Sequence, residues 1–204
     1  MKLQPGDGGV EILFASEEAG VLKQLVHQLI MLLESHSRTA LDPDPLFASL
    51  EIGGSDTTPA DPALARLLPD AFADAEDAAG YRRVTEQGLI NRKLQDALQV
   101  IADLTVTPLN AEEFSVDAGG DPELGDGSPV PVNITPDSFP AWARTVTALR
   151  LAMAARIGLE REEDYDRLID ADATRGTVLV YDWLAALLEA VVALGHASDS
   201  VDEA

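Results

Sequence analysis

The segment from Tyr81 to Leu104 keeps a helical pattern over the longest run in this 204-residue chain. Its apolar side chains recur at spacings of three and four residues, which places them on one stripe of an α-helix. That stripe consists of Ile90, Leu94, Ala97, Ile101 and Leu104. A stripe of this length needs other elements to pack against, so the segment predicts the central helix of an α-helical domain.

Three further segments carry the same periodicity and predict long helices over residues 17–34, 136–157 and 174–194. Ser16 and Thr135 are the expected N-caps of the first two, and Gly158 is the expected stop of the second. The third is apolar around most of its circumference, which is typical of a buried bundle helix or of an oligomer interface. Its expected stripe is Leu179, Trp183, Leu187, Ala190 and Leu194.

Two short β-prone runs, at residues 10–14 and 130–134, each precede a hydroxyl side chain and a long helix. One such strand alone would be marginal, so we expect the two runs to pair as an antiparallel ribbon, with Pro131 confining its strand to an edge. The predicted fold class is mainly α, a bundle of four long helices plus short helices with a minor two-stranded β ribbon. One of the short helices is expected over residues 61–67, with Asp61 as its N-cap.

The chain length suits one sizeable domain, which we expect to span residues 1–196. An acidic, glycine-rich loop near residues 110–128 is expected to be flexible, and residues 197–204 are expected to form a disordered acidic tail.

The chain has 36 acidic and 14 basic residues and a formal net charge of −22. Such a charge repels phosphate backbones and anionic lipids, which argues against direct binding to nucleic acid or to a membrane. The charge could serve only solubility, or an acidic face could bind a basic partner protein. A homodimer is also compatible with the sequence. The longest apolar-rich run, residues 183–194, contains Glu189 and is too short to span a bilayer.

There are no cysteines, which excludes disulfides, thiol nucleophiles and Cys-ligated metal sites. The N-terminal segment lacks the apolar stretch of a signal peptide, so the expected compartment is the cytoplasm. His27, His36 and His196 form no metal-binding motif, and the acidic loop lacks the EF-hand spacing. We therefore expect no catalytic residues, no metal and no cofactor.

Arg82, Arg83, Arg92 and Lys93 form the densest basic cluster of the sequence. They could recognise an anion or an acidic peptide, or they could pair with carboxylates of the same chain. Glu86 follows Arg82 by four residues and Arg83 by three, so local ion pairs are geometrically easy. The cluster is therefore expected to be structural first, with a binding role left open.

Arg150 lies between apolar neighbours on a predicted helix, so its guanidinium is expected to be partly buried. A buried guanidinium requires a carboxylate, for which Asp182, beside Trp183, and Glu86 are the candidates. We expect a polar tie between helices rather than an active site. The predicted interaction or structural polar network is Arg82, Arg83, Glu86, Arg150, Asp182 and Trp183.

A family resemblance is carried by five segments in order: SEEAGVLKQLVHQLIMLL, ARLLPDAF, GYRRVTEQGLINRK, WARTVTALRLAMAARIG and VYDWLAALLEAVV. Together they resemble the actinobacterial domain of unknown function 2017 family, whose members are often encoded beside the protease adaptor ClpS. Thr147 and Ala148 stand where the family usually has an Asn-Asp pair, which weakens any proposal of chemistry on this helix. The residues that match the family pattern are Glu18, Leu22, Leu67, Pro69, Arg82, Thr85, Glu86, Trp142, Leu149, Arg150, Asp182, Trp183 and Glu189.

The resemblance and the charge together imply a non-enzymatic cytoplasmic regulatory or adaptor protein that acts through protein–protein contacts. Transcription regulation and proteolysis control are the two settings that the resemblance suggests, and a basic transcription or proteolysis factor is the expected partner. The alternative is a helical small-molecule sensor. A sensor would need a largely apolar pocket of several hundred Å3, with a few converging polar groups, between the long helices.

Overall fold

Four long helices make up most of the computed structural model, which describes residues 1–6, 9–40, 54–105 and 129–199. The long helices are α1 (Ser16–Ala40), α4 (Ala75–Asp103), α5 (Phe139–Ile157) and α7 (Asp172–Asp199), and the short ones are α3 (Pro62–Leu67) and α6 (Asp164–Asp170). The predicted mainly α fold is confirmed. The acidic loop predicted near residues 110–128 lies outside the described residues, and so do residues 200–204 of the predicted tail. The prediction of disorder is wrong for residues 197–199, which belong to α7.

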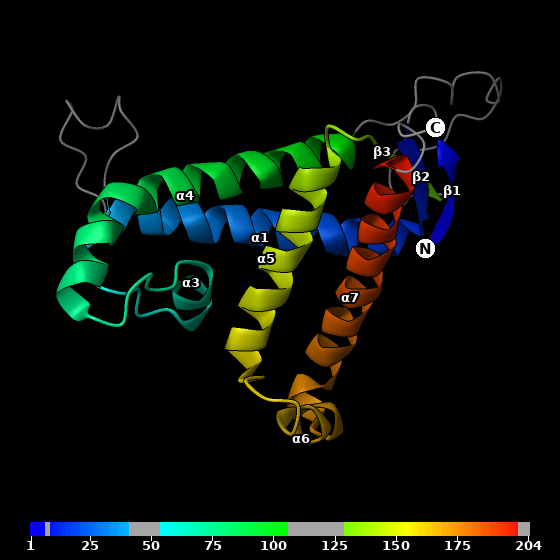
Figure 1. Ribbon diagram of the computed structural model, residues 1–204. Helices are drawn as coiled ribbons and strands as arrows, with labels where there is room; N and C mark the ends of the chain where they lie inside the picture. The colour runs from blue at the N-terminus through cyan, green and yellow to red at the C-terminus, as the bar shows by residue number, and fades with distance from the viewer. Residues whose placement is uncertain (7–8, 41–53, 106–128, 200–204) are drawn as a thin grey trace, which may run out of the picture.

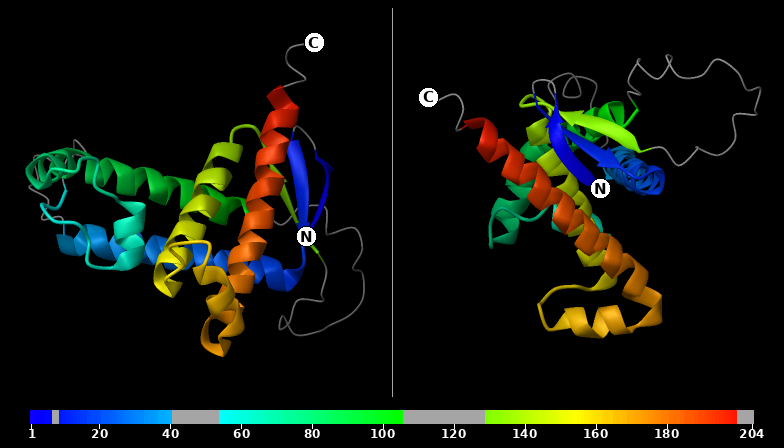
Figure 2. Two further views of the ribbon diagram at one scale, coloured as in Figure 1. Left: turned by 60° about the horizontal axis from the view of Figure 1, so that its bottom comes forward. Right: turned by 90° about the vertical axis from the view of Figure 1, so that its right-hand side faces the viewer.

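The long helices form two antiparallel pairs that cross each other (Figure 1). α1 and α4 lie side by side in one pair, and α5 and α7 lie side by side in the other (Figure 2). α3 packs on α5, whereas α6 packs on α7 at the end of the second pair that is far from α4. Side chains of all four long helices therefore meet where the two pairs cross.

The apolar stripe of α4 forms one wall of the core. Ile90, Ala97 and Leu104 are buried, and Leu94 and Ile101 pack against the same core from partly exposed positions. The stripe predicted for the central helix is therefore confirmed. Burial of this kind contributes roughly 25 cal/mol per Å2 of apolar surface removed from water, so this face holds α4 in place.

Trp142 of α5 is the largest fully buried side chain among the described residues. Its ring stacks on Phe14 at a centroid distance of 6.4 Å, which joins the small sheet to α5. The indole N–H donates a hydrogen bond to Oδ2 of Asp103 at 2.7 Å. A buried Trp needs such a partner for its N–H, and here that partner comes from the end of α4.

Three short strands, β1 (Lys2–Gly6), β2 (Gly9–Phe14) and β3 (Val130–Ile134), form an antiparallel sheet in the order β1-β2-β3. Val10 lies opposite Ile134, and Phe14 lies opposite Val130. The predicted pairing of residues 10–14 with 130–134 is confirmed, and β3 is an edge strand as Pro131 suggested. β1 was missed, although the Asp7-Gly8 dipeptide between it and β2 is a common hairpin signal in sequences.

All four long helices start at other residues than predicted: α1, α4 and α7 start earlier, at Ser16, Ala75 and Asp172, and α5 starts later, at Phe139. α1 includes Ser16, and its first turn is closed by Glu18, whose Oε2 accepts a hydrogen bond from the Ala15 N–H at 2.9 Å. This is the half of a capping box that a carboxylate at the third helical position supplies. α5 begins at Phe139 rather than at Pro136, because residues 135–138 form a turn.

The predicted end of α5 and the predicted start of α3 are confirmed. Gly158 adopts the left-handed conformation with φ of 73°, which glycine tolerates better than any other residue. Asp61 accepts hydrogen bonds from the backbone N–H groups of Ala63 and Leu64, at 2.8 and 3.1 Å.

α7 buries a different stripe from the one predicted. Leu187 is fully buried as expected, but Leu179 is 57% exposed. Within residues 172–193 of α7, the buried residues are Val178, Leu184, Leu187 and Val191. Because this helix is apolar on nearly every side, its periodicity alone does not say which face packs.

By length and composition, one helix in the described part of the chain could cross a membrane. It is the segment Asp172–Ala193 of α7, with a mean hydropathy of 1.6. This segment is longer than the apolar run of residues 183–194, because it also includes the first turns of α7. Core helices of soluble proteins pass the same test, and α7 does contribute Leu184, Leu187 and Val191 to the core.

Candidate functional site

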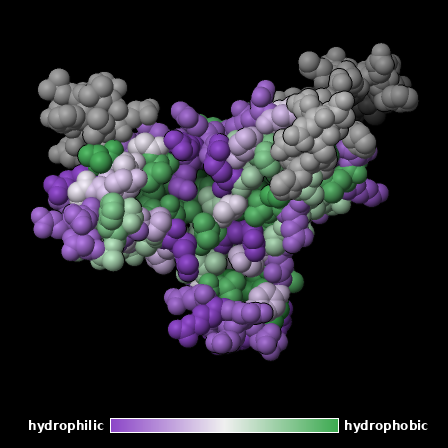
Figure 3. Space-filling view, viewed as in Figure 1, coloured by the Kyte–Doolittle hydropathy of each residue, from purple (hydrophilic) through white to green (hydrophobic). Residues whose placement is uncertain are grey.

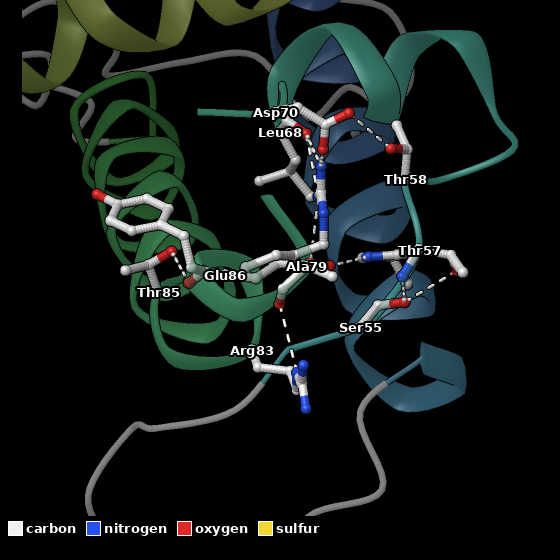
Figure 4. Close-up of polar contacts among 12 residues, drawn as sticks. Ser55, Thr57, Thr58, Leu68, Asp70, Ala79, Arg83, Thr85 and Glu86 are labelled. Atoms are coloured by element: carbon white, nitrogen blue, oxygen red, sulfur yellow. Dashed lines mark hydrogen bonds and ion pairs between the residues drawn. The ribbon is translucent and has the colours of Figure 1, made fainter. Parts of the chain in front are cut away.

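Arg82 is a buried residue of α4 that binds residues following α3. Figure 4 shows three of its partners, Leu68, Asp70 and Glu86. Both of its terminal nitrogens donate to the carbonyl oxygen of Leu68 at 3.1 Å. Nη2 also donates to Oδ1 of Asp70 at 2.6 Å, and Nη1 donates to Oε2 of Glu86 at 3.3 Å. The guanidinium is therefore occupied by groups of its own chain and ties the end of α3 to α4.

The charges in the cluster of Arg82, Asp70 and Glu86 stabilise one another. Burial lowers the pKa of Arg82, but its hydrogen bonds to Asp70 and Glu86 outweigh burial, and the net shift is upward. The pKa of Asp70 is held below its ordinary value by hydrogen bonds from Arg82 and from the Thr58 hydroxyl. These shifts have the sign expected for ion pairs that hold the fold together.

Glu86 is bound on its other side by α1. Nε2 of His36 lies 2.5 Å from Oε1 of Glu86, whose side chain is only 1% exposed. The sequence predicted no metal-binding role for His36, and this contact with Glu86 was not predicted either. A signal was present, because His36 follows the fully buried Leu33 by three residues and so continues the inner face of the helix.

Gly54 passes directly against α4 beside this cluster. A Cβ atom at this position would lie 2.1 Å from the carbonyl oxygen of Arg82 and 3.0 Å from Cβ of Glu86. Only glycine fits so close an approach, so this residue brings the segment before α3 against α4.

Arg83, which follows Arg82 in sequence, points away from the buried cluster. Its side chain is 57% exposed, and its Nε lies 3.2 Å from Oδ1 of Asp56. The predicted pair with Glu86 is not formed, because both oxygens of Glu86 are held by Arg82 and His36. The two adjacent arginines therefore differ completely in environment.

The remaining three residues of the predicted network lie elsewhere, so the six do not form one network. The guanidinium of Arg150 stacks over the ring of Tyr181 at 4.4 Å. Asp182 accepts a hydrogen bond from the Tyr165 hydroxyl at 2.6 Å. The two candidate partners proposed for Arg150 are thus engaged by other residues, and a cation–π contact takes their place.

Trp183 faces the start of α1. Its buried indole N–H makes no hydrogen bond within 3.5 Å in the described part of the chain. It is nevertheless close enough to Glu18 to help lower the pKa of that carboxyl group. Burial raises the pKa of Glu18, and hydrogen bonds from the N-terminal amino group and from Ala15 lower it further than burial raises it.

The last two members of the basic cluster, Arg92 and Lys93, line a cleft of about 470 Å3 between α4, α5 and α7. Its walls are largely aliphatic, and Figure 3 shows hydrophobic side chains gathered where α5 and α7 lie side by side. The aliphatic residues of the cleft are Leu29, Leu89, Ala143, Ala148, Leu151, Leu188 and Val192. The volume falls within the range typical of small-molecule sites.

Polar groups converge on one side of this cleft. Arg144 of α5 binds Asp96 of α4 through two hydrogen bonds, from Nε and Nη2, each of 2.7 Å. This pair raises the pKa of Arg144. Burial lowers the pKa of Lys93, an effect that the nearby Asp96 only partly offsets. Periodicity could not have found the Asp96–Arg144 pair, because it joins two helices whose relative placement only the fold defines.

Within residues 1–6, 9–40, 54–105 and 129–199, no group of three or more His, Cys, Asp or Glu side chains could hold a metal ion. The structure has two candidate sites. One is the cluster around Arg82, whose charged groups pair with one another, and the other is a largely apolar cleft with cations at one side.

Comparison with known proteins gives a family match over almost the whole chain. The model of the family described as "Domain of unknown function (DUF2017)" matches residues 1–194. The chain is 28% identical over 193 residues to a Mycobacterium leprae (strain TN) protein named "Putative oxidative stress regulator AosR", covering 87% of this chain and 78% of that protein. No solved structure is significantly similar.

Proposed function

The chain belongs to the family described as "Domain of unknown function (DUF2017)", and we propose that it is a non-enzymatic cytoplasmic regulatory protein that acts through contacts with a basic protein partner. The observation that carries the proposal is the name of its Mycobacterium leprae relative, which is that of a regulator. Regulators act by binding, and the candidate partners are a basic factor of transcription or of proteolysis.

The pairing of Arg82 and Arg83 with carboxylates of the chain favours a basic partner over an anionic one. Arg82 is buried and Arg83 is paired with Asp56, so half of the basic cluster is already neutralised by the chain itself. The exposed surface near α6 is strongly acidic, and Figure 3 shows it as a hydrophilic lobe. Its exposed acids include Glu160, Glu162, Glu163 and Asp166.

The absence of cysteine sets a limit on how this protein could take part in an oxidative stress response. Without a thiol, the chain cannot form a disulfide or a sulfenic acid. If it regulates such a response, the oxidant must be detected by its partner or by another route.

A mobility-shift titration and a capture experiment test the proposal. At about 150 mM salt, where a net negative protein gains nothing from phosphate contacts, we expect no shift of duplex DNA by the purified protein. We expect an immobilised bait to capture a basic protein from its host lysate, and Glu162→Lys/Glu163→Lys to reduce that capture. Arg83→Glu, also on the surface but of opposite sign, is the control and should leave capture unchanged. A DNA shift at this salt concentration would refute the proposal.

A second function is supported by the cleft. A small-molecule sensor requires an apolar cavity with a few polar groups, and the cleft of about 470 Å3 next to Lys93 has both properties. In that case a ligand would change the stability or the surface of the protein, and a thermal-shift screen of small amphipathic compounds would detect it.

A further inference from the structure

The cleft combines aliphatic walls with an excess of positive charge, which is unusual for a chain with a net charge of −22. Arg92, Lys93 and Arg144 line it, and Asp96 is the one acid among the lining residues in the described part of the chain. These side chains come from α4 and α5, so the charges lie on the two helices that form one side of the cleft. The local balance of fixed charges is therefore positive.

Lys93 forms no ion pair with any residue that the structure describes, because Arg144 takes up the nearby Asp96. Arg144 donates to both oxygens of Asp96 at 2.7 Å, which occupies that carboxylate in a two-point contact. Among the described residues no carboxylate lies within ion-pairing distance of the Lys93 ammonium group. Burial disfavours the charged form of Lys93, and its pKa is lowered as a result.

Thr145, a residue of the cleft wall, has a buried hydroxyl without a partner among the described residues. The residue is 2% exposed and lines the cleft, and its Oγ1 has no hydrogen-bond partner in the described part of the chain. Thr147, two residues later on the same helix, satisfies its own hydroxyl by donating to the Ala143 carbonyl oxygen at 2.7 Å. A buried hydroxyl without a partner is costly and is commonly explained by a missing ligand or water.

We propose that this cleft binds a small amphipathic monocarboxylate. Its apolar body lies against Leu89, Leu151 and Leu188, and its carboxylate accepts hydrogen bonds from Lys93 and Thr145. One unpaired ammonium group and one unpaired hydroxyl match the single charge and the acceptor oxygens of a carboxylate. The aliphatic walls favour an amphipathic anion over inorganic phosphate, and a cationic ligand would face repulsion from the side chains of Arg92 and Lys93.

This inference gives the sensor alternative a ligand class, and it does not depend on the proposed contacts with a basic partner. A failed capture experiment would leave it untouched, and its own failure would leave the protein-contact proposal untouched.

Calorimetric titrations with sodium octanoate, 1-octanol and octylamine test the proposal on the full-length chain. The three probes share an eight-carbon body and differ in charge. We expect octanoate to bind at one site and about tenfold more tightly than octanol, because a charge-assisted hydrogen bond contributes roughly one factor of ten in affinity. Octylamine should bind more weakly than octanol.

Two variants, each with a new side chain close in size to the original one, test whether Lys93 and Thr145 contact the carboxylate. Lys93→Met should reduce octanoate affinity by about tenfold and leave octanol affinity unchanged. Thr145→Val should reduce octanoate affinity by roughly threefold while leaving the free protein at least as stable, because it removes an unpaired buried hydroxyl. Lys23→Met, the same exchange on α1 at a residue that does not line the cleft, is the control.

Three results would overturn the proposal. The first is no binding of octanoate, and the second is unchanged octanoate affinity in Lys93→Met with native circular dichroism. The third is octanol binding as tight as octanoate binding, which would assign an apolar ligand to the cleft and end the carboxylate assignment.

Discussion

The two adjacent arginines of α4 show that burial, not residue type, decides what a basic side chain does in this protein. Arg82 is buried and makes four hydrogen bonds to its own chain, whereas Arg83 lies in solvent beside Asp56. A buried cation in this position supports several acceptors at once, so its removal leaves those acceptors unpaired. An exposed ion pair supports little, because water competes for both partners.

Replacing Arg82 with Met should therefore be far more damaging than the same replacement of Arg83. We expect Arg82→Met to lower the free energy of unfolding by about 3–5 kcal/mol, because it leaves Glu86 buried without its cation. Arg83→Met should change it by less than about 1 kcal/mol. Urea unfolding followed by circular dichroism measures both. Equal losses in the two variants would show that the buried cluster is not a structural unit.

Asp70 makes this cluster sensitive to acid. Its pKa is lowered by Arg82 and Thr58, so its ionised form stabilises the folded state. That contribution is fully present above the unfolded-state pKa of about 3.9 and is lost as the pH falls through the lower folded-state pKa. Asp70→Asn should be less stable than the parent at pH 7, and the gap should shrink in urea titrations below about pH 4. A gap that does not change with pH would contradict this account.

At the scale of secondary structure, the short helix α3 depends on a side chain at its start. α3 has only six residues, too few to be stable by its own backbone hydrogen bonds. It is held by the Asp61 cap and by packing on α5, and Asp61 also contacts Arg156 of α5 at 3.3 Å. One carboxylate thus starts the helix and fastens it to its neighbour.

Two variants of Asp61 separate these roles. Asp61→Asn keeps an acceptor for the backbone N–H groups and loses the ion pair, so it should cost less than about 0.5 kcal/mol. Asp61→Ala loses both and should cost about 1 kcal/mol or more. Thermal unfolding of the two variants beside the parent measures the difference. Equal losses would assign the effect to the ion pair instead of the cap.

Most elements that the sequence predicted correctly have a local cause, and the pairing of β2 with β3 is the exception. The stripe of α4, the Asp61 cap and the Gly158 stop each depend on residues within a few positions of one another, and all three are found in the structure. The prediction of the buried stripe of α7 was wrong because nearly every face of that helix is apolar. Packing against α5, and not the sequence of α7 itself, decides that Leu184 is buried and Leu179 is exposed.

The polar sites were harder to predict for the same reason. Arg82 with Glu86 was foreseen, since four residues separate them on one helix. His36 and Asp70 were not, because they reach Glu86 and Arg82 from other segments of the chain. The cleft lined by Lys93 and Arg144 depends entirely on how α4, α5 and α7 are placed.

For the molecule as a whole, the net charge of −22 opposes folding. Like charges crowd together when the chain becomes compact, and this repulsion weakens as salt screens it. The exposed ion pairs, such as Arg167 with Asp164 and Arg175 with Asp172, are screened as well, but each contributes little. Repulsion should therefore dominate the response to salt.

Raising sodium chloride from about 20 mM to about 500 mM should raise the melting temperature by several degrees, because the Debye length falls well below the spacing of most surface charges. Differential scanning calorimetry measures the change. Potassium chloride at the same ionic strength is the control for specific ion binding and should give the same increase. A fall in the melting temperature would mean that attractive pairs outweigh the net charge.

The three-stranded sheet has a consequence for how the chain folds during its synthesis. β2 finds β1 immediately before it, but its other partner, β3, leaves the ribosome only after α1, α3 and α4 have been made. Until then one edge of β2 stays open, and open edges invite pairing with other chains. Strand closure and the docking of α5, which directly follows β3, are therefore late steps. A nascent chain released before residue 130 keeps that edge exposed.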